Sequence, residues 1–432
     1  MPSFTSTAIL FPFILQAIPG SWSAPTGAPL LSRQTSEPEE YTANSEIGPG
    51  GSTFLDSPHF RVYGNSGDEA QNAIGKLEAA FECFVRGLNF RSTGLSFNSD
   101  NDAGPWTKTN IYAVPELANA AGVMHSDATT GMGYVEVQQD YLTAADVTVH
   151  EWGHALHYHQ KTWVDQSRTG AWWEMFANWI ADTYQTSNNC AAAREKHDQP
   201  TEDTMIDLPK VIGDSFQVIV DGSVDTDNYY QSWPFLTYLT NNLDAFPGLG
   251  EDTLRQMMAQ YDAGSNETPL HTLQRVAGNT SVAEIVGRYW ARMAFVDIGH
   301  PSAGAVFEAV KGQINYENVQ ASAAGSYAVI AARRPQYMGA NIIPLSATGG
   351  TVSVEITADA AYTATLAVSS STGVTYTVVE GSGSVEVAAG DEVTLVVANT
   401  PEELILYDAF SLTSDVQKGL DYSFTLSGAT VV

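Results

Sequence analysis

The sequence predicts an α+β fold that ends in an all-β domain. Three observations lead to this prediction. Strand-like and helix-like segments are interleaved between residues 53 and 190, and the stretch 191–340 is mostly helical in pattern. From 341 to 432 the chain turns to short alternating runs of Val, Thr, Ser, Ala and Gly, spaced like the strands of a β-sandwich. With 432 residues, 44% of them hydrophobic, the chain can build two or three domain cores.

The N-terminal end reads as a secretory signal. Residues 8–18 form a short apolar run, and small residues follow it with a cleavage point near Ser23, so we assign 1–23 as a signal peptide. Residues 24–52 are rich in Pro, Gly, Ser, Thr and Glu and are interpreted as a linker or propeptide. Ordered structure is therefore expected to begin near Phe54.

The first lobe, residues 53–190, contains the clearest periodic segments. Apolar alternation predicts strands at 59–64, 109–116 and 133–138, and helical periodicity predicts helices over 68–90 and 144–161. Further helices, separated by Gly, Pro and Asn, are expected over 170–186, 228–243, 250–261 and 281–297. The expected domain order is a first lobe over 53–190, a helical lobe over 191–340 and a β-sandwich over 341–432.

Charge and cysteine content narrow the function classes. Asp and Glu total 49 against 19 Lys and Arg, giving a net charge of −30, which excludes nucleic acid and anionic membranes as partners. No apolar run reaches the roughly 18 residues needed to cross a bilayer. The two cysteines, Cys83 and Cys190, are expected to form one disulfide in an oxidising, extracellular compartment; two separately buried thiols are the alternative.

The segment DVTVHEWGHALHYHQ carries an H-E-x-x-H motif at His150, Glu151 and His154. Residues four apart on a helix are offset by about 40° and rise about 6 Å, so both imidazoles can bind one ion. Val149, Trp152 and Leu156 form an apolar stripe on the opposite side of the helix. Gly153 lies between the two histidines, where a missing Cβ lets another backbone approach.

A catalytic zinc needs a third protein ligand. The extended pattern with a third histidine is absent, because position 160 holds Gln160. Glu174 instead lies in GAWWEMFANWIADTY, a helix apolar on nearly every side, where a buried carboxylate requires a cationic partner. Asn178, one turn further on, is expected to orient His150, and Asp182 or His157 is the reserve ligand.

HEWGH followed by Glu174 after 19 intervening residues resembles the gluzincin metallopeptidases. It also resembles a set of secreted bacterial and fungal proteins that pair this helix with a W-E-x-x-A-N-W helix. The resemblance implies a zincin-like catalytic domain with one Zn²⁺ held by His150, His154 and Glu174. Glu151 would then be the general base. It further implies that the strand 133–137 is the sheet edge that pairs with an extended peptide.

In this group a later Tyr or His stabilises the oxyanion, and either Tyr229 or Tyr230 is a candidate; we select Tyr230. The predicted function is that of a secreted zinc endopeptidase acting on a peptide, protein or glycoprotein substrate. A non-catalytic binding or adhesion protein with a structural metal is the alternative, and a hydrolase of non-peptide amides or esters is a third. Calcium at the acidic stretches 98–104 and 221–228 is not supported, since neither completes a binding loop.

Overall fold

The computed structural model describes residues 37–164 and 166–432, so the signal-peptide assignment at 1–23 lies outside the described residues. The chain divides into two compact units. The first comprises the chain up to Gln166, Phe176–Met205 and Tyr261–Asn266. The second comprises Ser167–Met175, Ile206–Gln260 and Glu267–Val432. Helix α3 (Gly170–Thr186) contributes residues to both.

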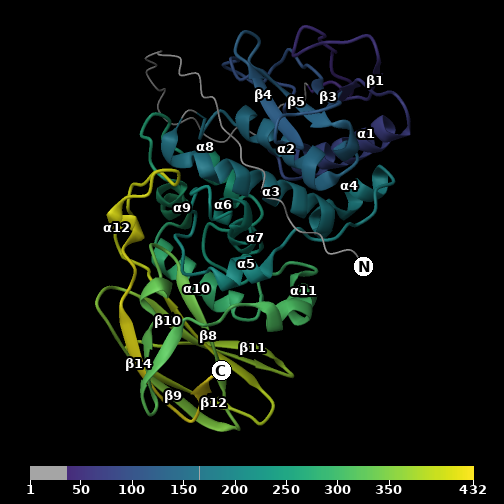
Figure 1. Ribbon diagram of the computed structural model, residues 1–432. Coiled ribbons are helices and arrows are strands. Elements are labelled where there is room, and N and C mark those ends of the chain that lie inside the picture. The colour runs from purple at the N-terminus through teal and green to yellow at the C-terminus, as the bar shows by residue number, and fades with distance from the viewer. Residues whose placement is uncertain (1–36, 165) are drawn as a thin grey trace. The chain divides into compact units, whose positions relative to one another are not determined.

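A five-stranded mixed sheet organises the first unit (Figure 1). Its order is β1-β2-β3-β5-β4. The strands are β1 (Phe54–Asp56), β2 (Phe60–Tyr63), β3 (Thr109–Val114), β4 (Gly122–Asp127) and β5 (Met132–Gln138). The pairs β2/β3 and β3/β5 are parallel, whereas β1 and β4 are antiparallel to their neighbours.

The sheet order corrects one expectation from the resemblance. Strand β5, which includes 133–137, is not the edge strand; it lies between β3 and β4, and β4 forms the edge. Strand β4 was not predicted, because GVMHSD has no regular alternation of apolar and polar residues. Its pairing with β5 comes from a turn that closes at Gly131, whose N–H donates to the Asp127 carbonyl.

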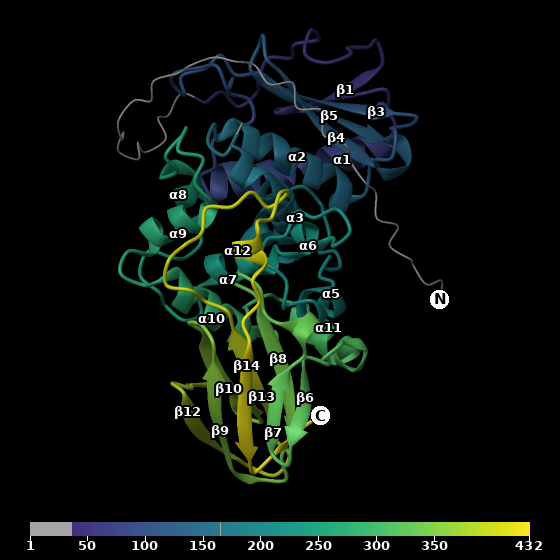
Figure 2. The ribbon, with the colours of Figure 1, turned by 60° about the vertical axis from the view of Figure 1, so that its left-hand side comes forward.

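Helices α1 (Asp68–Phe81) and α2 (Ala145–His159) pack on this sheet, with α2 against β4 and β5 (Figures 1 and 2). The predicted apolar stripe of α2 is confirmed, since Val149, Trp152 and Leu156 are each 0% exposed. The predicted helix over 68–90 changes character after Phe81, where the π-helical turn η1 (Glu82–Gly87) continues it. The helix α4 (Ala191–Lys196) completes the first unit.

Residues 37–53 are packed against the sheet, so the expectation that order begins near Phe54 is wrong. Tyr41 and Ile47 are buried, and the Asn110 side-chain amide donates to the carbonyls of Asn44 and Ile47. The Tyr112 hydroxyl also donates to the Ile47 carbonyl. Single apolar residues set among Gly, Pro and Ser give no periodic signal, which is why the linker interpretation of 24–52 missed this packing.

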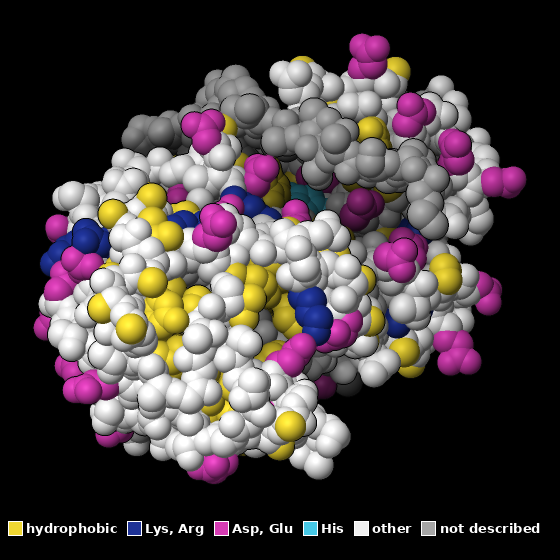
Figure 3. All heavy atoms as spheres, turned by 60° about the horizontal axis from the view of Figure 1, so that its bottom comes forward, with side chains coloured by type: hydrophobic (Ala, Val, Ile, Leu, Met, Phe, Trp, Pro, Cys, Tyr) yellow, Lys and Arg dark blue, Asp and Glu magenta, His cyan; other side chains and the backbone are white. Residues whose placement is uncertain are grey.

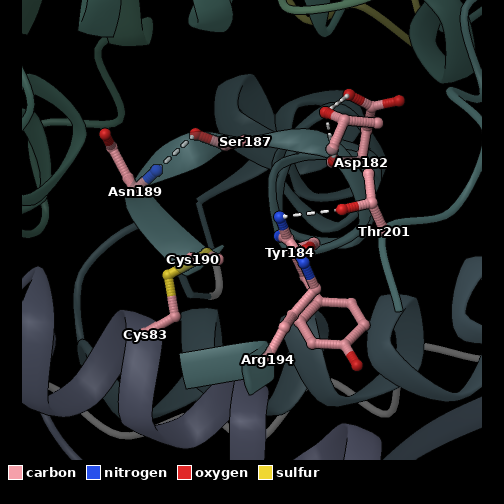
Figure 4. Close-up of a disulfide and its surroundings, with 9 residues drawn as sticks. Cys83, Asp182, Tyr184, Ser187, Asn189, Cys190, Arg194 and Thr201 are labelled. Carbon is pink, nitrogen blue, oxygen red and sulfur yellow. Dashed lines mark hydrogen bonds between the residues drawn. A yellow bond between two sulfur atoms is a disulfide. The ribbon is translucent and has the colours of Figure 1, made fainter. Parts of the chain in front are cut away.

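The disulfide Cys83–Cys190 forms as predicted, which excludes two separate thiols (Figure 4). It joins η1 to the 3₁₀ turn η4 (Asn188–Cys190), where the Ser187 hydroxyl accepts the Asn189 N–H at 3.1 Å. The bridged cysteines are 107 residues apart. A loop of about 100 residues closed in this way is stabilised by about 4.7 kcal/mol in the chain-entropy treatment. The bridge therefore fastens the end of α1 to the segment that follows α3.

The helical part of the second unit consists of short helices. They are α5 (Leu208–Gly213), α6 (Asn228–Gln231), α7 (Pro234–Asn241), α8 (Thr253–Ala259), α9 (Pro269–Ala277), α10 (Val282–Met293) and α11 (Ala303–Val310). The helix predicted over 228–243 is divided into α6 and α7 because Pro234 lacks an N–H and begins a new helix instead of continuing one.

Two antiparallel five-stranded sheets form the C-terminal β region (Figure 2). Their orders are β11-β10-β13-β8-β15 and β12-β9-β14-β7-β6. The strands are β6 (Val319–Ala323), β7 (Ser326–Val329), β8 (Ala340–Ser346), β9 (Gly350–Ala358), β10 (Thr363–Ser370), β11 (Gly373–Val378), β12 (Ser382–Val387), β13 (Glu392–Ala398), β14 (Tyr422–Ser427) and β15 (Thr430–Val431). One apolar core takes side chains from both sheets, as a sandwich requires. The strands begin at Val319, before the predicted boundary at 341. Strand β6 is short and largely exposed, so its sequence has few of the large apolar residues by which a strand is predicted.

The surface reflects the acidic composition. Asp and Glu side chains are spread over the face shown in Figure 3, with fewer Lys and Arg among them. Among the described residues, no helix has the length and apolar character that a membrane span needs.

Candidate metal centre

Two helices bring three metal-ligating side chains together. His150 and His154 project from α2, and Glu174 comes from α3; one ligand atom of each lies within 4.8 Å of the others. His150 and Glu174 are buried, at 8% and 4% exposure. The two Nε2 atoms are 3.1 Å apart. Two nitrogens bound tetrahedrally at about 2.0–2.1 Å from one zinc would lie about 3.3 Å apart, so this spacing suits a shared ion. The predicted convergence is confirmed.

Gly153 allows α2 and α3 to approach closely. A Cβ built on this glycine would lie 3.1 Å from the Ala177 Cα and 3.2 Å from the Ile180 Cβ. Such contacts are tighter than nine in ten real Cβ contacts, so with a larger residue the neighbouring atoms of α3 would have to shift by a few tenths of an ångström. The close approach predicted at Gly153 is confirmed. The close approach brings residues of α3 to the histidine face of α2.

Asn178 fixes the orientation of the His150 ring. Its side-chain oxygen lies 2.7 Å from His150 Nδ1, and both residues are buried. An amide oxygen only accepts hydrogen bonds, so Nδ1 carries the proton and donates it. Nε2 is then left with its lone pair directed toward His154 and Glu174, as a metal ligand requires. This contact was expected from the one-turn spacing of Glu174 and Asn178.

Replacing Asn178 with alanine is expected to lower zinc affinity by about 10–100-fold, because the His150 ring loses the partner that sets its tautomer. Asn178→Asp, which keeps an acceptor at the same position, should retain most of the affinity. Competition with a chromophoric chelator measures both values, and circular dichroism verifies the fold. Equal affinity in the alanine variant and the unmodified protein would show that the contact does not orient the ligand.

Glu151 lies beside the edge strand of the sheet. A Cβ built on Gly122, the first residue of β4, would stand 2.5 Å from Glu151 Cγ and 2.9 Å from its Oε1. The carboxylate therefore occupies space that only glycine leaves open. Glu151 is 6% exposed and precedes His154 by three residues on α2. Sequence reasoning missed Gly122, because a glycine in ANAAGVMH carries no signal of a tertiary contact.

The other two histidines of α2 are core residues. His159 Nε2 accepts the Gly133 N–H of β5 at 3.2 Å, and Nδ1 lies 2.7 Å from the Leu95 carbonyl in the segment that precedes β3, so both ring nitrogens make contacts within the fold. Burial lowers the pKa of His157 and of His159 to about 3, which keeps both rings neutral. Both side chains are buried, at 2% and 0% exposure, so neither faces solvent.

Asp182 makes hydrogen bonds within the fold and lies outside the candidate metal-binding group. Its Oδ1 accepts hydrogen bonds from the Thr204 hydroxyl at 2.6 Å and the Met205 N–H at 2.9 Å. Eight residues along a helix correspond to a rise of about 12 Å, so Asp182 is too far along α3 to share an ion with Glu174. Neither Asp182 nor His157 is in the three-residue group found among the described residues.

The tyrosine pair lies at α6. The centroids of the Tyr229 and Tyr230 rings are 4.5 Å apart. Burial raises the Tyr229 pKa, and the Glu174 carboxylate raises it further, which places this phenol within electrostatic range of the metal ligand. The assignment of Tyr230 as the oxyanion-stabilising residue stays a prediction.

The acidic stretches form turns. The Asp221 carboxylate accepts the Ser223 N–H, and the Asn228 side-chain oxygen accepts the Asp221 N–H and the Ser232 hydroxyl. In the stretch 98–104, Asn101 accepts the Ala103 N–H through its side chain. These bonds are typical of turns.

Fold and site together define an α+β protein with a candidate His-His-Glu metal centre. The model of a family of unknown function (DUF6055) matches residues 65–386, which is more than half of the chain, and the chain belongs to this family. The match contains α2 and α3 and so includes all three candidate ligands. No curated protein matches the chain.

Proposed function

We propose that this protein is a secreted zinc-dependent hydrolase of the gluzincin type, acting as an endopeptidase. The observation that carries the proposal is the convergence of His150, His154 and Glu174, with the Glu151 carboxylate held on the same helix as the two histidines. Two imidazoles and one carboxylate form the ligand set of zinc peptidases, which leave a further coordination position for water or substrate.

The donor set fits zinc. The Asn178 oxygen fixes the proton of His150 on Nδ1, so Nε2 is the ligand nitrogen, and the buried Glu174 carboxylate supplies a negative charge in the same three-residue group. A zinc ion bound there would supply Lewis acidity, which lowers the pKa of water toward about 7 and polarises the scissile carbonyl. Glu151 would remove a proton from the attacking water and then deliver it to the leaving amine.

The edge strand β4 supports a peptide substrate. An edge strand presents unpaired backbone groups to which an extended peptide can add as a further strand. Because Glu151 lies against Gly122 at the start of β4, a peptide paired with this strand would pass the general base. Backbone pairing supplies affinity without demanding one sequence, as an endopeptidase requires.

The disulfide supports export. Cys83–Cys190 closes a long loop between two buried residues, and such bridges persist in oxidising compartments. With a net charge of −30, the protein would act on peptide or protein substrates rather than on nucleic acid or anionic membranes.

Metal analysis combined with an unbiased cleavage profile tests the proposal. We expect about one zinc per chain. Mass spectrometry of a mixed peptide library should show internal cleavage that stops on chelation and returns on adding zinc. A zinc-loaded protein that cleaves neither peptides nor glycoproteins would favour a binding or adhesion protein whose metal is structural.

Gly122→Ala tests the placement of Glu151. The added methyl group must displace the carboxylate, and a displacement of about 1 Å can lower turnover by about 100-fold. Zinc content should not change, because no ligand is touched. Ser126→Ala, at an exposed position of the same strand, is the matched control and should cleave peptides at the unmodified rate. Equal turnover in both variants would place the base elsewhere.

A further inference from the structure

The connection between β13 and β14 leaves the sandwich and returns along the helices of its own unit (Figure 2). Two hydrogen bonds anchor it there. The Tyr407 hydroxyl donates to the Val220 carbonyl at 3.2 Å, and the Gly222 N–H donates to the Ala409 carbonyl at 2.9 Å. Tyr407 and Ala409 are both buried, at 2% exposure each. The residue that follows, Phe410, is therefore held in a fixed position.

Phe410 packs where two glycines leave space. A Cβ built on Gly170 would lie 2.9 Å from its ring, and a Cβ built on Gly222 would lie 2.7 Å from it. The ring also makes an edge contact with Tyr229, with centroids 5.6 Å apart. Despite these contacts the side chain remains 46% exposed. One side of the ring is therefore packed on the protein, and the other is exposed.

This open ring lies close to a candidate metal ligand. Gly170 and Glu174 are four residues apart on α3, so they share a face of the helix and are separated by a rise of about 6 Å. Tyr229, which contacts Phe410, lies within electrostatic range of Glu174. Two independent observations therefore place Phe410 near the candidate metal centre: its contact with the first turn of α3 and its contact with Tyr229.

The β region is firmly attached to the helices that it meets. Helix α10 packs on β8, β10 and β13. Its Arg292 forms an ion pair with Asp244 at 2.7 Å, and its guanidinium lies 5.1 Å from the centre of the Tyr376 ring on β11. These contacts belong to one compact unit, which also contains Gly170, so the sandwich can hold the Phe410 loop at a set place beside this glycine.

We propose that Phe410 forms the wall of a substrate subsite that receives a bulky apolar side chain next to the scissile bond, so that the C-terminal β region takes part in choosing the substrate. This inference rests on the proposed peptidase function. An aromatic ring packed on Tyr229 and bordered by two glycines offers apolar surface at this point, and apolar side chains are what such a surface selects. Phe410 acts in specificity and takes no part in the chemistry.

Cleavage profiling of the full-length zinc-loaded protein tests the subsite. Two peptides are compared. The first is the best-cleaved library peptide with a large apolar residue beside the cleaved bond, and the second has alanine in place of that residue. Phe410→Ala should lower the kcat/KM ratio between the two peptides by about tenfold, whereas Phe410→Leu should keep most of it. Phe54→Ala is the control, because Phe54 is also an exposed aromatic (40%) in edge contact with a tyrosine, and it should change nothing.

A binding measurement gives a readout independent of turnover. In the Glu151→Gln background, the Kd of the same peptide should rise about tenfold on adding Phe410→Ala, with unchanged zinc content. If the unmodified protein cleaves peptides and Phe410→Ala keeps both its residue preference and its Kd, this inference alone is overturned. A zinc-loaded wild type that cleaves no peptide overturns the proposed function and the inference with it. If the alanine variant fails to fold, Phe410→Gln, which keeps much of the side-chain volume but not its apolar surface, replaces it, and an unaltered residue preference in Phe410→Gln overturns the subsite.

Discussion

Glu151→Gln is expected to abolish most hydrolysis while the protein keeps its metal. A general base contributes about 10²–10⁴-fold to the rate, and glutamine cannot accept the proton from water. The substitution is nearly isosteric, so the contact with Gly122 persists and the three ligands are untouched. Turnover of the best library peptide should therefore fall by about 10²–10⁴-fold at constant zinc content.

Asp146→Asn is the matched control for this variant. Asp146 is an exposed carboxylate in the first turn of the same helix, and its removal changes the charge by the same amount. It should leave turnover and zinc content as they are. Undiminished hydrolysis by Glu151→Gln would refute the assignment of the base. A fall of similar size in both variants would indicate a general effect of charge.

Glu174→Gln is expected to release the metal. Its carboxylate is one of three ligands, and a neutral amide is a far weaker zinc ligand. Loss of a direct ligand should exceed the about 10–100-fold reduction that follows loss of an outer partner such as Asn178. Zinc affinity by chelator competition, followed by metal analysis after dialysis, measures the effect.

Asp182→Asn is the companion variant, because Asp182 was the reserve ligand on the same helix. Its hydrogen bonds to Thr204 and Met205 predict a small loss of stability with full zinc binding. Full zinc occupancy in Glu174→Gln combined with loss in Asp182→Asn would move the third ligand and disprove the centre described above.

The candidate metal centre could be predicted from the sequence because its determinants are local. Two histidines four residues apart share a helix face whatever surrounds them. Glu174 was found because a carboxylate in an otherwise apolar helix needs a cation, and Asn178 because it lies one turn further on. The predicted bounds of helix α3 agree with the observed ones, because its apolar pattern is long and uninterrupted.

Features that depend on tertiary packing could not be predicted. The contact of Gly122 with Glu151 joins residues 29 positions apart, and that of Phe410 with Gly170 joins the β region to α3. The edge position of β4 follows from strand order, which periodicity does not encode. The packing of Tyr41 and Ile47 escaped notice because isolated apolar residues in a Gly-rich stretch resemble a linker.

Anomalous diffraction at the zinc edge, on crystals of the zinc-loaded protein, tests the metal centre most directly. We predict one strong peak about 2.0–2.2 Å from His150 Nε2, His154 Nε2 and a Glu174 oxygen, with a non-protein ligand in the remaining position. A peak elsewhere in the molecule, or a fourth protein side chain closing the coordination, would contradict a catalytic His-His-Glu centre.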